Sequence, residues 1–222
     1  MSLYAVLREY LNSNVKKVLW VHYEGNDLRD LEKEKKNNIL NNYLNNLNFT
    51  QNLKFRQSEI DILANKYLLK SYKKIKLENN INSFKFKIVN FLKLNKLRKQ
   101  YQILLNPKFI YKLATRGTSP QPLSEFKKIL RLSKEFVNKN NAKLYFVYLP
   151  EYNRFKVNYD NKNYNSVKNI ISELDIPFID LNKEVFEKEE NPLKLFPFEQ
   201  LGHYTIEGYE KISKIIYKFT KD

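Results

Sequence analysis

Residues 18–27, VLWVHYEGND, constrain the fold of this chain more than any other stretch. Five of the first six residues are apolar or aromatic, and the stretch ends in a Gly-Asn-Asp turn. A short run of β-branched and aromatic residues bounded by a turn is typical of a buried strand. Ligands of open α/β sheets bind just beyond the carboxyl ends of the strands. We therefore expect residues 23–27 to border a site, with the Asn26 carboxamide as a hydrogen-bond donor. The alternative for Asn26 is a turn residue whose side chain satisfies the local backbone, and Asp27 is expected to cap the helix that follows.

Helix and strand patterns alternate in the second half of the chain. An amphipathic helical pattern over residues 126–137 precedes the apolar run 143–149, KLYFVYL, and a further helical pattern precedes the short run 177–181, PFIDL. This alternation of helix and strand patterns predicts an α/β fold with a parallel sheet covered by helices. A helical pattern over residues 3–11 leads into the first strand. Because a crossover helix normally joins two parallel strands, we expect an upstream strand and interpret the chain as N-terminally truncated.

The region between the first two strands is predicted to be a helical insertion over residues 31–115 of a single domain, 1–222. Apolar residues at 31–47 suit one helix, and Ser58 is placed to cap a second. Residues 70–105 alternate Lys with Phe, Ile and Leu, which fits a basic amphipathic helix or a strand-like arm. Such a segment is either a solvated helix face or a contact for a membrane surface or partner. Residues 116–122, RGTSPQP, predict a loop.

Composition excludes several classes of protein. The chain is 42% hydrophobic and 14% aromatic, which is incompatible with a disordered chain. It has no Cys, which excludes disulfides and thiolate metal sites, and its 4 Gly form no phosphate-binding loop, so we expect no cofactor and no metal. No apolar run is long enough to span a membrane. The net charge of +16 comes from Lys scattered among abundant Asn and Ile, as AT-rich coding produces, so we expect no specific nucleic-acid partner.

The last segment places a histidine just before a predicted helix. Thr205 is expected to cap this helix, whose apolar stripe is Tyr209, Ile212, Ile215, Ile216 and Phe219. His203 lies on the loop before the cap. There the positive end of the helix dipole favours the neutral imidazole that a general base needs. His22, inside the first strand, is expected to be a core residue. Glu151 and Arg154 follow the second strand and are expected to line the same cleft, with a surface ion pair as the alternative for Arg154.

Two separated pieces, the strand ending in Gly25-Asn26-Asp27 and the segment GHYTIEGY at 202–209, together resemble the SGNH/GDSL hydrolase family. The resemblance covers residues 1–30 and 142–222. It implies a three-layer α/β fold and metal-independent ester hydrolysis or acyl transfer, on an acylated small molecule, glycan or lipid. By this resemblance Asn26 is the oxyanion-hole donor and His203 the base, with Gly25 and Asp27 beside the substrate. A preorganised amide donor and a positioned imidazole are what acyl transfer requires.

The chain departs from the family pattern at three points. Glu24 stands where the family has Gly, and Gln200 stands where the family commonly has Asp, so Glu199 or the loop backbone would have to orient His203. The nucleophilic serine of a Gly-Asp-Ser segment is absent, and neither Ser119 nor Ser2 follows a strand. We therefore expect no hydrolysis by this chain alone.

The serine would then come from a missing upstream segment of the same protein. Such a segment would allow an extracytoplasmic or membrane-anchored full-length protein, but the sequence itself assigns no location. The alternative function is a non-catalytic module that binds a partner or an anionic surface through its Lys-rich insertion.

Overall fold

The computed structural model describes residues 1–92, 121–156 and 159–221. Its contacts divide the chain into two compact units, one formed by residues 1–51 and 121–222 and the other by residues 52–120. The predicted loop at 116–120 and the 93–105 part of the Lys-rich stretch lie outside the described residues. Both halves of the family resemblance fall in the first unit.

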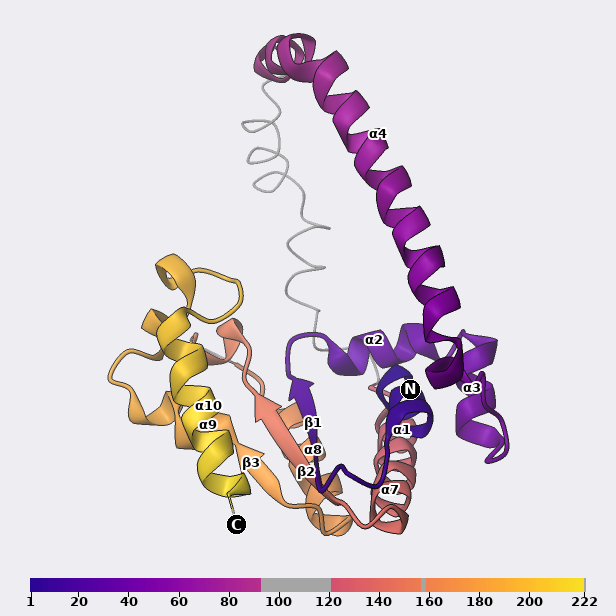
Figure 1. The fold of residues 1–222 in the computed structure, drawn as a ribbon. Helices are drawn as coiled ribbons and strands as arrows, with labels where there is room; N and C mark the ends of the chain where they lie inside the picture. Colours follow the sequence, from indigo (N-terminus) through magenta and orange to yellow (C-terminus); the bar gives the residue numbers. More distant parts are fainter. Residues whose placement is uncertain (93–120, 157–158, 222) are drawn as a thin grey trace. The chain divides into compact units, whose positions relative to one another are not determined.

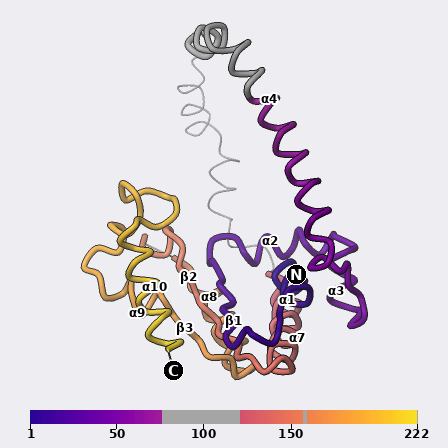
Figure 2. The backbone as a smooth tube through the Cα atoms, in the orientation of Figure 1, coloured from indigo at the N-terminus to yellow at the C-terminus, as the bar shows by residue number. Residues whose placement is uncertain are grey.

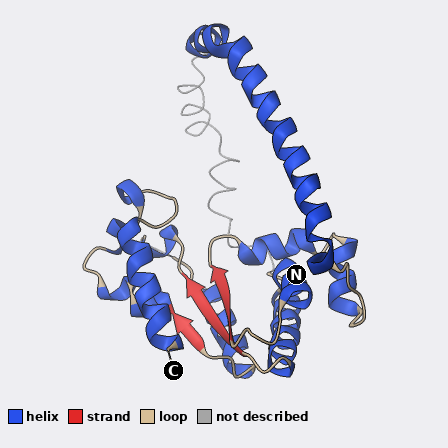
Figure 3. Cartoon of the chain, viewed as in Figure 1, coloured by secondary structure: helices blue, strands red, loops and turns tan. Residues whose placement is uncertain are grey.

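A parallel sheet forms the centre of the first unit (Figure 3). Among the described residues it has three strands, β1 (Lys17–Tyr23), β2 (Lys143–Leu149) and β3 (Phe178–Asp180), in the order β1-β2-β3. Val21 lies opposite Val147, which in turn lies opposite Ile179. The predicted strands and the α/β class are thereby confirmed. Because the strands are parallel, the loops that follow β1 and β2 leave the same edge of the sheet.

Helices cover both faces of this sheet (Figure 1). On one face lie α1 (Ser2–Tyr10), α7 (Leu123–Lys139) and α8 (Lys162–Glu173), and on the other lie α9 (Leu181–Glu184) and α10 (Ile206–Thr220). Helices α1 and α7 are far apart in sequence but lie side by side (Figures 1 and 2). Strand β2 is buried on both faces, since Phe146 packs in one core cluster and Val147 in the other. This explains why its sequence is a continuous apolar run.

The segment after β1 differs from the prediction. Instead of one helix over 31–47 there are two, α2 (Asp27–Glu34) and α3 (Asn38–Asn45), so that prediction is wrong. Asn37 separates them, because its side-chain oxygen accepts hydrogen bonds from the backbone amides of Ile39 and Leu40 and so caps α3. Both helices belong to the unit that contains the sheet. The second unit therefore begins at Asn52 and not at residue 31.

The described part of the second unit is η1 (Leu53–Arg56) followed by α4 (Gln57–Leu92). Ser58 is not a cap, since it is the second residue of α4. The helix also shows that residues 70–92 are not a strand-like arm. Large apolar side chains of α4 are exposed: Ile62, Leu63, Tyr67, Leu68, Leu69, Tyr72 and Ile75. No helix among the described residues has the length and apolarity needed to cross a membrane.

Short 3₁₀ turns connect α9 to α10 and position the loop that contains His203. They are η3 (Phe186–Lys188), η4 (Pro192–Leu195) and η5 (Pro197–Glu199). Phe186, Leu195 and Phe196 anchor them in the second core cluster. Thr205 caps α10 as predicted, because its hydroxyl accepts a hydrogen bond of 3.1 Å from the Gly208 amide. The start of α10 is therefore fixed directly after the histidine loop.

Candidate functional site

Three loops meet at the carboxyl edge of the sheet. The loop after β1 is held to β2 by a 2.9 Å hydrogen bond from the Glu24 amide to the Leu149 carbonyl. The loop before α10 is held to the loop after β2 twice. The Tyr204 hydroxyl donates to the Pro150 carbonyl at 2.5 Å, and the Tyr152 hydroxyl donates to the Glu199 carbonyl at 2.7 Å. The loops that contain Asn26, Arg154 and His203 are thus connected to one another by one backbone hydrogen bond and two tyrosine hydroxyls that donate to backbone carbonyls.

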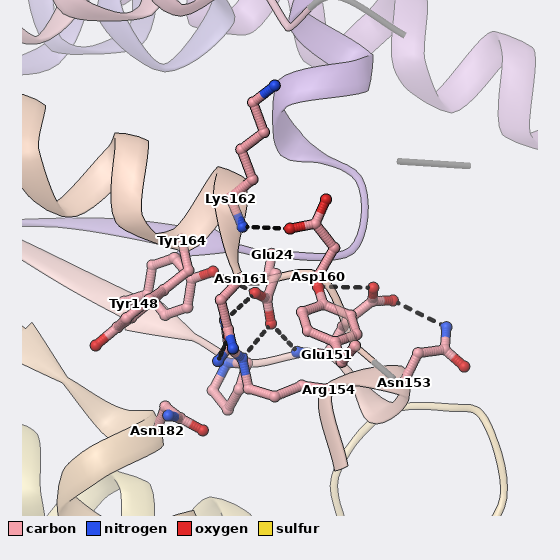
Figure 4. Close-up of polar contacts among 12 residues, drawn as sticks. Glu24, Tyr148, Glu151, Asn153, Arg154, Asp160, Asn161, Lys162, Tyr164 and Asn182 are labelled. Atoms are coloured by element: carbon pink, nitrogen blue, oxygen red, sulfur yellow. Dashed lines mark hydrogen bonds and ion pairs between the residues drawn. The ribbon is translucent and has the colours of Figure 1, made fainter. Parts of the chain in front are cut away.

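A buried ion pair between Glu24 and Arg154 is the centre of this edge (Figure 4). Only 3% of the Glu24 side chain and 8% of the Arg154 side chain are exposed. Arg154 Nε donates to Glu24 Oε2 at 2.8 Å, and Nη2 donates to Oε1. The Glu151 amide also donates to Oε2, at 3.0 Å, and the Tyr148 hydroxyl donates to Oε1, at 2.6 Å. Two donors on each oxygen offset the cost of burying the carboxylate.

The remaining surface of the guanidinium is also occupied. Arg154 Nη1 donates to Asn161 Oδ1 at 2.7 Å, and the guanidinium carbon lies 4.6 Å from the ring centre of Tyr164 and 5.1 Å from that of Tyr159. Burial alone would lower the pKa of Arg154, but the hydrogen bonds and charge of Glu24 outweigh it and raise that pKa. Arg154 therefore forms a buried pair and not the surface pair considered from sequence.

The neighbouring tyrosines are neutral hydrogen-bond donors. Burial, reinforced by the charge of Glu24, raises the pKa of Tyr148 and of Tyr159. Burial, reinforced by Glu151 and Glu24, raises the pKa of Tyr23 to about 12. The Tyr159 hydroxyl lies 3.2 Å from the Glu151 carboxylate, which also accepts from Asn153. The loop after β2 is thus fixed by its own polar contacts.

Asn26 is the N-cap residue of α2. Its carbonyl accepts the first helical hydrogen bond, from the Asp30 amide at 2.8 Å, and its side-chain Nδ2 donates to Asp30 Oδ2 at 2.5 Å. A carboxamide has two N–H donors, so one remains beyond the bond to Asp30. Asn26 thus occupies the cap position, but its side chain binds the Asp30 carboxylate and makes no cap hydrogen bond to the backbone; its role as an oxyanion donor stays a prediction.

Asp27 does not cap α2, so that prediction is wrong. It is the first residue of the helix, and its Oδ2 accepts a 2.8 Å hydrogen bond from the Tyr23 amide, at the end of β1. Burial, assisted by nearby carboxylates, raises the pKa of Asp27 to about 6. Gly25 lies close to a ring, because an added Cβ would be 2.5 Å from Tyr23 Cε1. Glycine here lets the Tyr23 ring fold over the turn.

His203 is exposed, and among the described residues it has no hydrogen bond or ion pair. The proposed substitute acid, Glu199, makes no hydrogen bond or ion pair with His203 in the described part of the chain; its carboxylate accepts a hydrogen bond from Asn191 at 3.4 Å. Neither Glu199 nor Gln200 orients the imidazole in this structure. The nearest anchored neighbour of His203 in sequence is Tyr204, whose ring is buried.

The sequence interpretation missed the role of Glu24 and of the tyrosines around it. In the sequence, Glu24 is recognisable only as a departure from the family pattern. One signal was available, because a charged residue directly after an apolar strand needs a partner if it is buried. The prediction for His22 is confirmed, since its side chain is 2% exposed and lies among the rings of Phe126, Phe146 and Tyr148.

No family model, curated protein or solved structure matches this chain. Within residues 1–92, 121–156 and 159–221, no group of three or more His, Asp or Glu side chains is arranged to hold a metal ion. The functional argument therefore depends on the geometry of the carboxyl edge.

Proposed function

We propose that the sheet unit is an acyl-transfer half-site of SGNH/GDSL type. In this proposal Asn26 donates to the oxyanion of an acylated substrate and His203 acts as the base. The nucleophilic serine comes from a polypeptide segment outside this sequence. The substrate class is an ester of a glycan, a lipid or another small molecule.

One observation carries the proposal: the 2.5 Å hydrogen bond from Tyr204 to the carbonyl of Pro150. It fastens the residue after His203 to the end of β2, and the Glu24–Arg154 pair fastens the same loop to the turn that contains Asn26. A donor and a base on connected loops at the carboxyl ends of parallel strands agree with acyl-transfer geometry. The exposed imidazole of His203 also suits a base whose nucleophile arrives from elsewhere.

The first test measures proximity. The chain has no Cys, so Leu201→Cys can carry a single nitroxide label beside His203. We expect the label to broaden the NMR signals of the Asn26 side-chain amide. The matched control is the same label at Ser172→Cys in the last turn of α8, which should leave those signals sharp. If the label at position 201 leaves the Asn26 amide unaffected, the half-site does not exist.

The second test measures recognition of the transition state. Phenyl methylphosphonate, a tetrahedral anion, mimics the intermediate of ester cleavage, and such mimics bind more tightly than substrates. We expect it to shift the Asn26 side-chain amide signals. Asn26→Ala and His203→Gln should each weaken binding, whereas Asn45→Ala, at the exposed end of α3, should not. Equal binding by all variants would contradict the proposal.

The exposed side chains of α4 favour a second candidate function, binding to an anionic membrane surface. Exposed Lys66, Lys70 and Lys73 lie on the same helix as exposed Tyr67 and Leu68. The lysines can contact anionic lipid headgroups while the neighbouring apolar side chains enter the membrane surface. Co-sedimentation should then require phosphatidylserine in the vesicles and fall with salt. Replacing the three lysines with Gln should abolish it, and equal binding to phosphatidylcholine vesicles would exclude this candidate.

A further inference from the structure

A cavity of about 350 Å³ lies beside β1, apart from the Glu24–Arg154 pair. Its apolar walls include Trp20 from β1, Leu31 from α2, and Phe126 and Ile129 from α7. These side chains belong to the first core cluster or border it, and they are fixed by packing. The cavity is therefore a feature of the sheet unit, and its walls suit a flat apolar group.

A buried imidazole lacks a partner at this cavity. His22 lines the cavity and is 2% exposed, and its Nδ1 has no hydrogen bond among the described residues. Burial lowers the pKa of His22 to about 3, so the ring is neutral. Nδ1 lies 3.5 Å from Asp27 Oδ2. If Nδ1 carries the proton, this distance is too long for a good hydrogen bond to Asp27. If Nδ1 carries no proton, it and the Asp27 oxygen are two acceptors that face each other without a donor.

Asp27 is the acidic group at the cavity without a cationic partner. Asp30 pairs with Lys33, and Glu34 pairs with the amino group of Met1. In the described parts of the chain, Asp27 has only the neutral His22 and the amide of Tyr23. Its side chain is 35% exposed, so it is accessible from the cavity mouth. The Asp27 carboxylate is therefore available to bind a cationic ligand.

We propose that this cavity binds a small primary ammonium ion that carries a flat apolar group. The ammonium donates one hydrogen to the Asp27 carboxylate and another to His22 Nδ1, which satisfies both acceptors at once. The apolar group lies against Trp20 and Phe126, where the ring faces also attract the positive charge. The inference goes beyond the acyl-transfer proposal and does not depend on it.

Benzylammonium is a suitable probe, because it joins an ammonium group to one aromatic ring. Two control compounds separate the contributions: benzyl alcohol has no charge, and benzyltrimethylammonium has the charge but no N–H donor. Trp20 is the single Trp of the chain, so its fluorescence reports on the cavity alone. We expect saturable quenching by benzylammonium at pH 7.5 with a Kd of about 1 mM, which is a typical strength for so small a ligand.

The matched variants are Asp27→Asn and Asp175→Asn, which change the net charge equally. Asp175 is a fully exposed residue before β3. We expect Asp27→Asn to weaken benzylammonium binding at least about 10-fold and Asp175→Asn to leave it unchanged. Both control compounds should bind at least about 10-fold more weakly than benzylammonium.

Three results would overturn the proposal. They are no change in Trp20 fluorescence at concentrations far above 1 mM, equal binding of benzyl alcohol, and equal binding by Asp27→Asn. Circular dichroism checks that Asp27→Asn is folded. If it is not, the comparison of the three compounds on the unaltered chain decides the question, because it needs no variant.

Discussion

Glu24 and Arg154, 130 residues apart in sequence, form a buried ion pair that joins the loop after β1 to the loop after β2. The pair connects the turn that contains Asn26 to the segment that Tyr204 fastens. A change at either partner should therefore affect both the stability of the unit and the geometry of the candidate site.

Replacing one partner should be far more costly than replacing both. Arg154→Met leaves the Glu24 carboxylate buried and without its cation, so we expect a loss of about 3–5 kcal/mol in the free energy of unfolding. The double variant Glu24→Gln with Arg154→Met should recover a large part of that loss. Urea denaturation of the single and double variants measures the coupling. Independent, additive losses would mean that the two side chains do not interact as the structure shows.

Acid should destabilise the chain through His22. The folded-state pKa of about 3 lies below the ordinary 6.5, so the unfolded chain binds more protons between these values. Stability is therefore lost as the pH falls from about 6.5 towards 3, by up to about 1.4 kcal/mol per pH unit. Asp27 acts in the opposite direction. Its folded-state pKa of about 6 lies above the ordinary 3.8, which adds stability as the pH falls between these values.

The two histidines of the chain provide a matched pair for this prediction. His22→Gln removes the acid-sensitive contribution of His22 and leaves that of Asp27, so between about pH 6 and 4 the stability of the variant should rise relative to that of the unaltered chain as the pH falls, even if the variant is less stable overall. His203→Gln is the matched control, because it makes the same substitution at a histidine that is exposed and outside the core. Chemical denaturation at a series of pH values measures both. An unaltered slope in His22→Gln would show that another group controls acid unfolding.

Local patterns were sufficient to predict the strands and the last helix. β1 and β2 are runs of apolar residues, and the cap at Thr205 acts over only three residues. The boundary between α2 and α3 at Asn37 was not predicted, because Asn is frequent in this stretch and a capping Asn cannot be distinguished there from an Asn inside a helix. Asp27 was misassigned because its side chain accepts from Tyr23, behind it in the sequence, and not from the helix ahead.

The polar contacts at the centre of the candidate site could not be predicted from sequence patterns, for a physical reason. Glu24, Tyr148 and Arg154 acquire their roles only when the parallel sheet brings β1 beside β2. Nothing local to Glu24 indicates its partner. Asn26 and His203 could be chosen from sequence because turns and loops mark them, yet their roles depend on distances between loops that the sequence does not contain.

Loss of the helix cap should loosen the start of α10. Thr205→Ala removes the hydroxyl that accepts from the Gly208 amide, and we expect a loss of about 1 kcal/mol. Thr205→Ser keeps the acceptor and should lose much less. Ser213→Ala is the control, because the Ser213 hydroxyl is exposed within the same helix and should contribute little. Equal stability of Thr205→Ala and Ser213→Ala, measured by thermal unfolding, would contradict the role of the cap.

Two tyrosine hydroxyls hold the histidine loop, and their effects should be coupled. Tyr204→Phe frees the Pro150 carbonyl and Tyr152→Phe frees the Glu199 carbonyl, and each should lower stability by about 1–2 kcal/mol. Both bonds join the loop before α10 to the loop after β2. Once one bond is broken, the loop before α10 is already more mobile, so the remaining bond contributes less to stability. The double variant should therefore lose less than the sum of the single losses. Urea denaturation of the four proteins tests this, and strict additivity would show that the two bonds hold the loop independently.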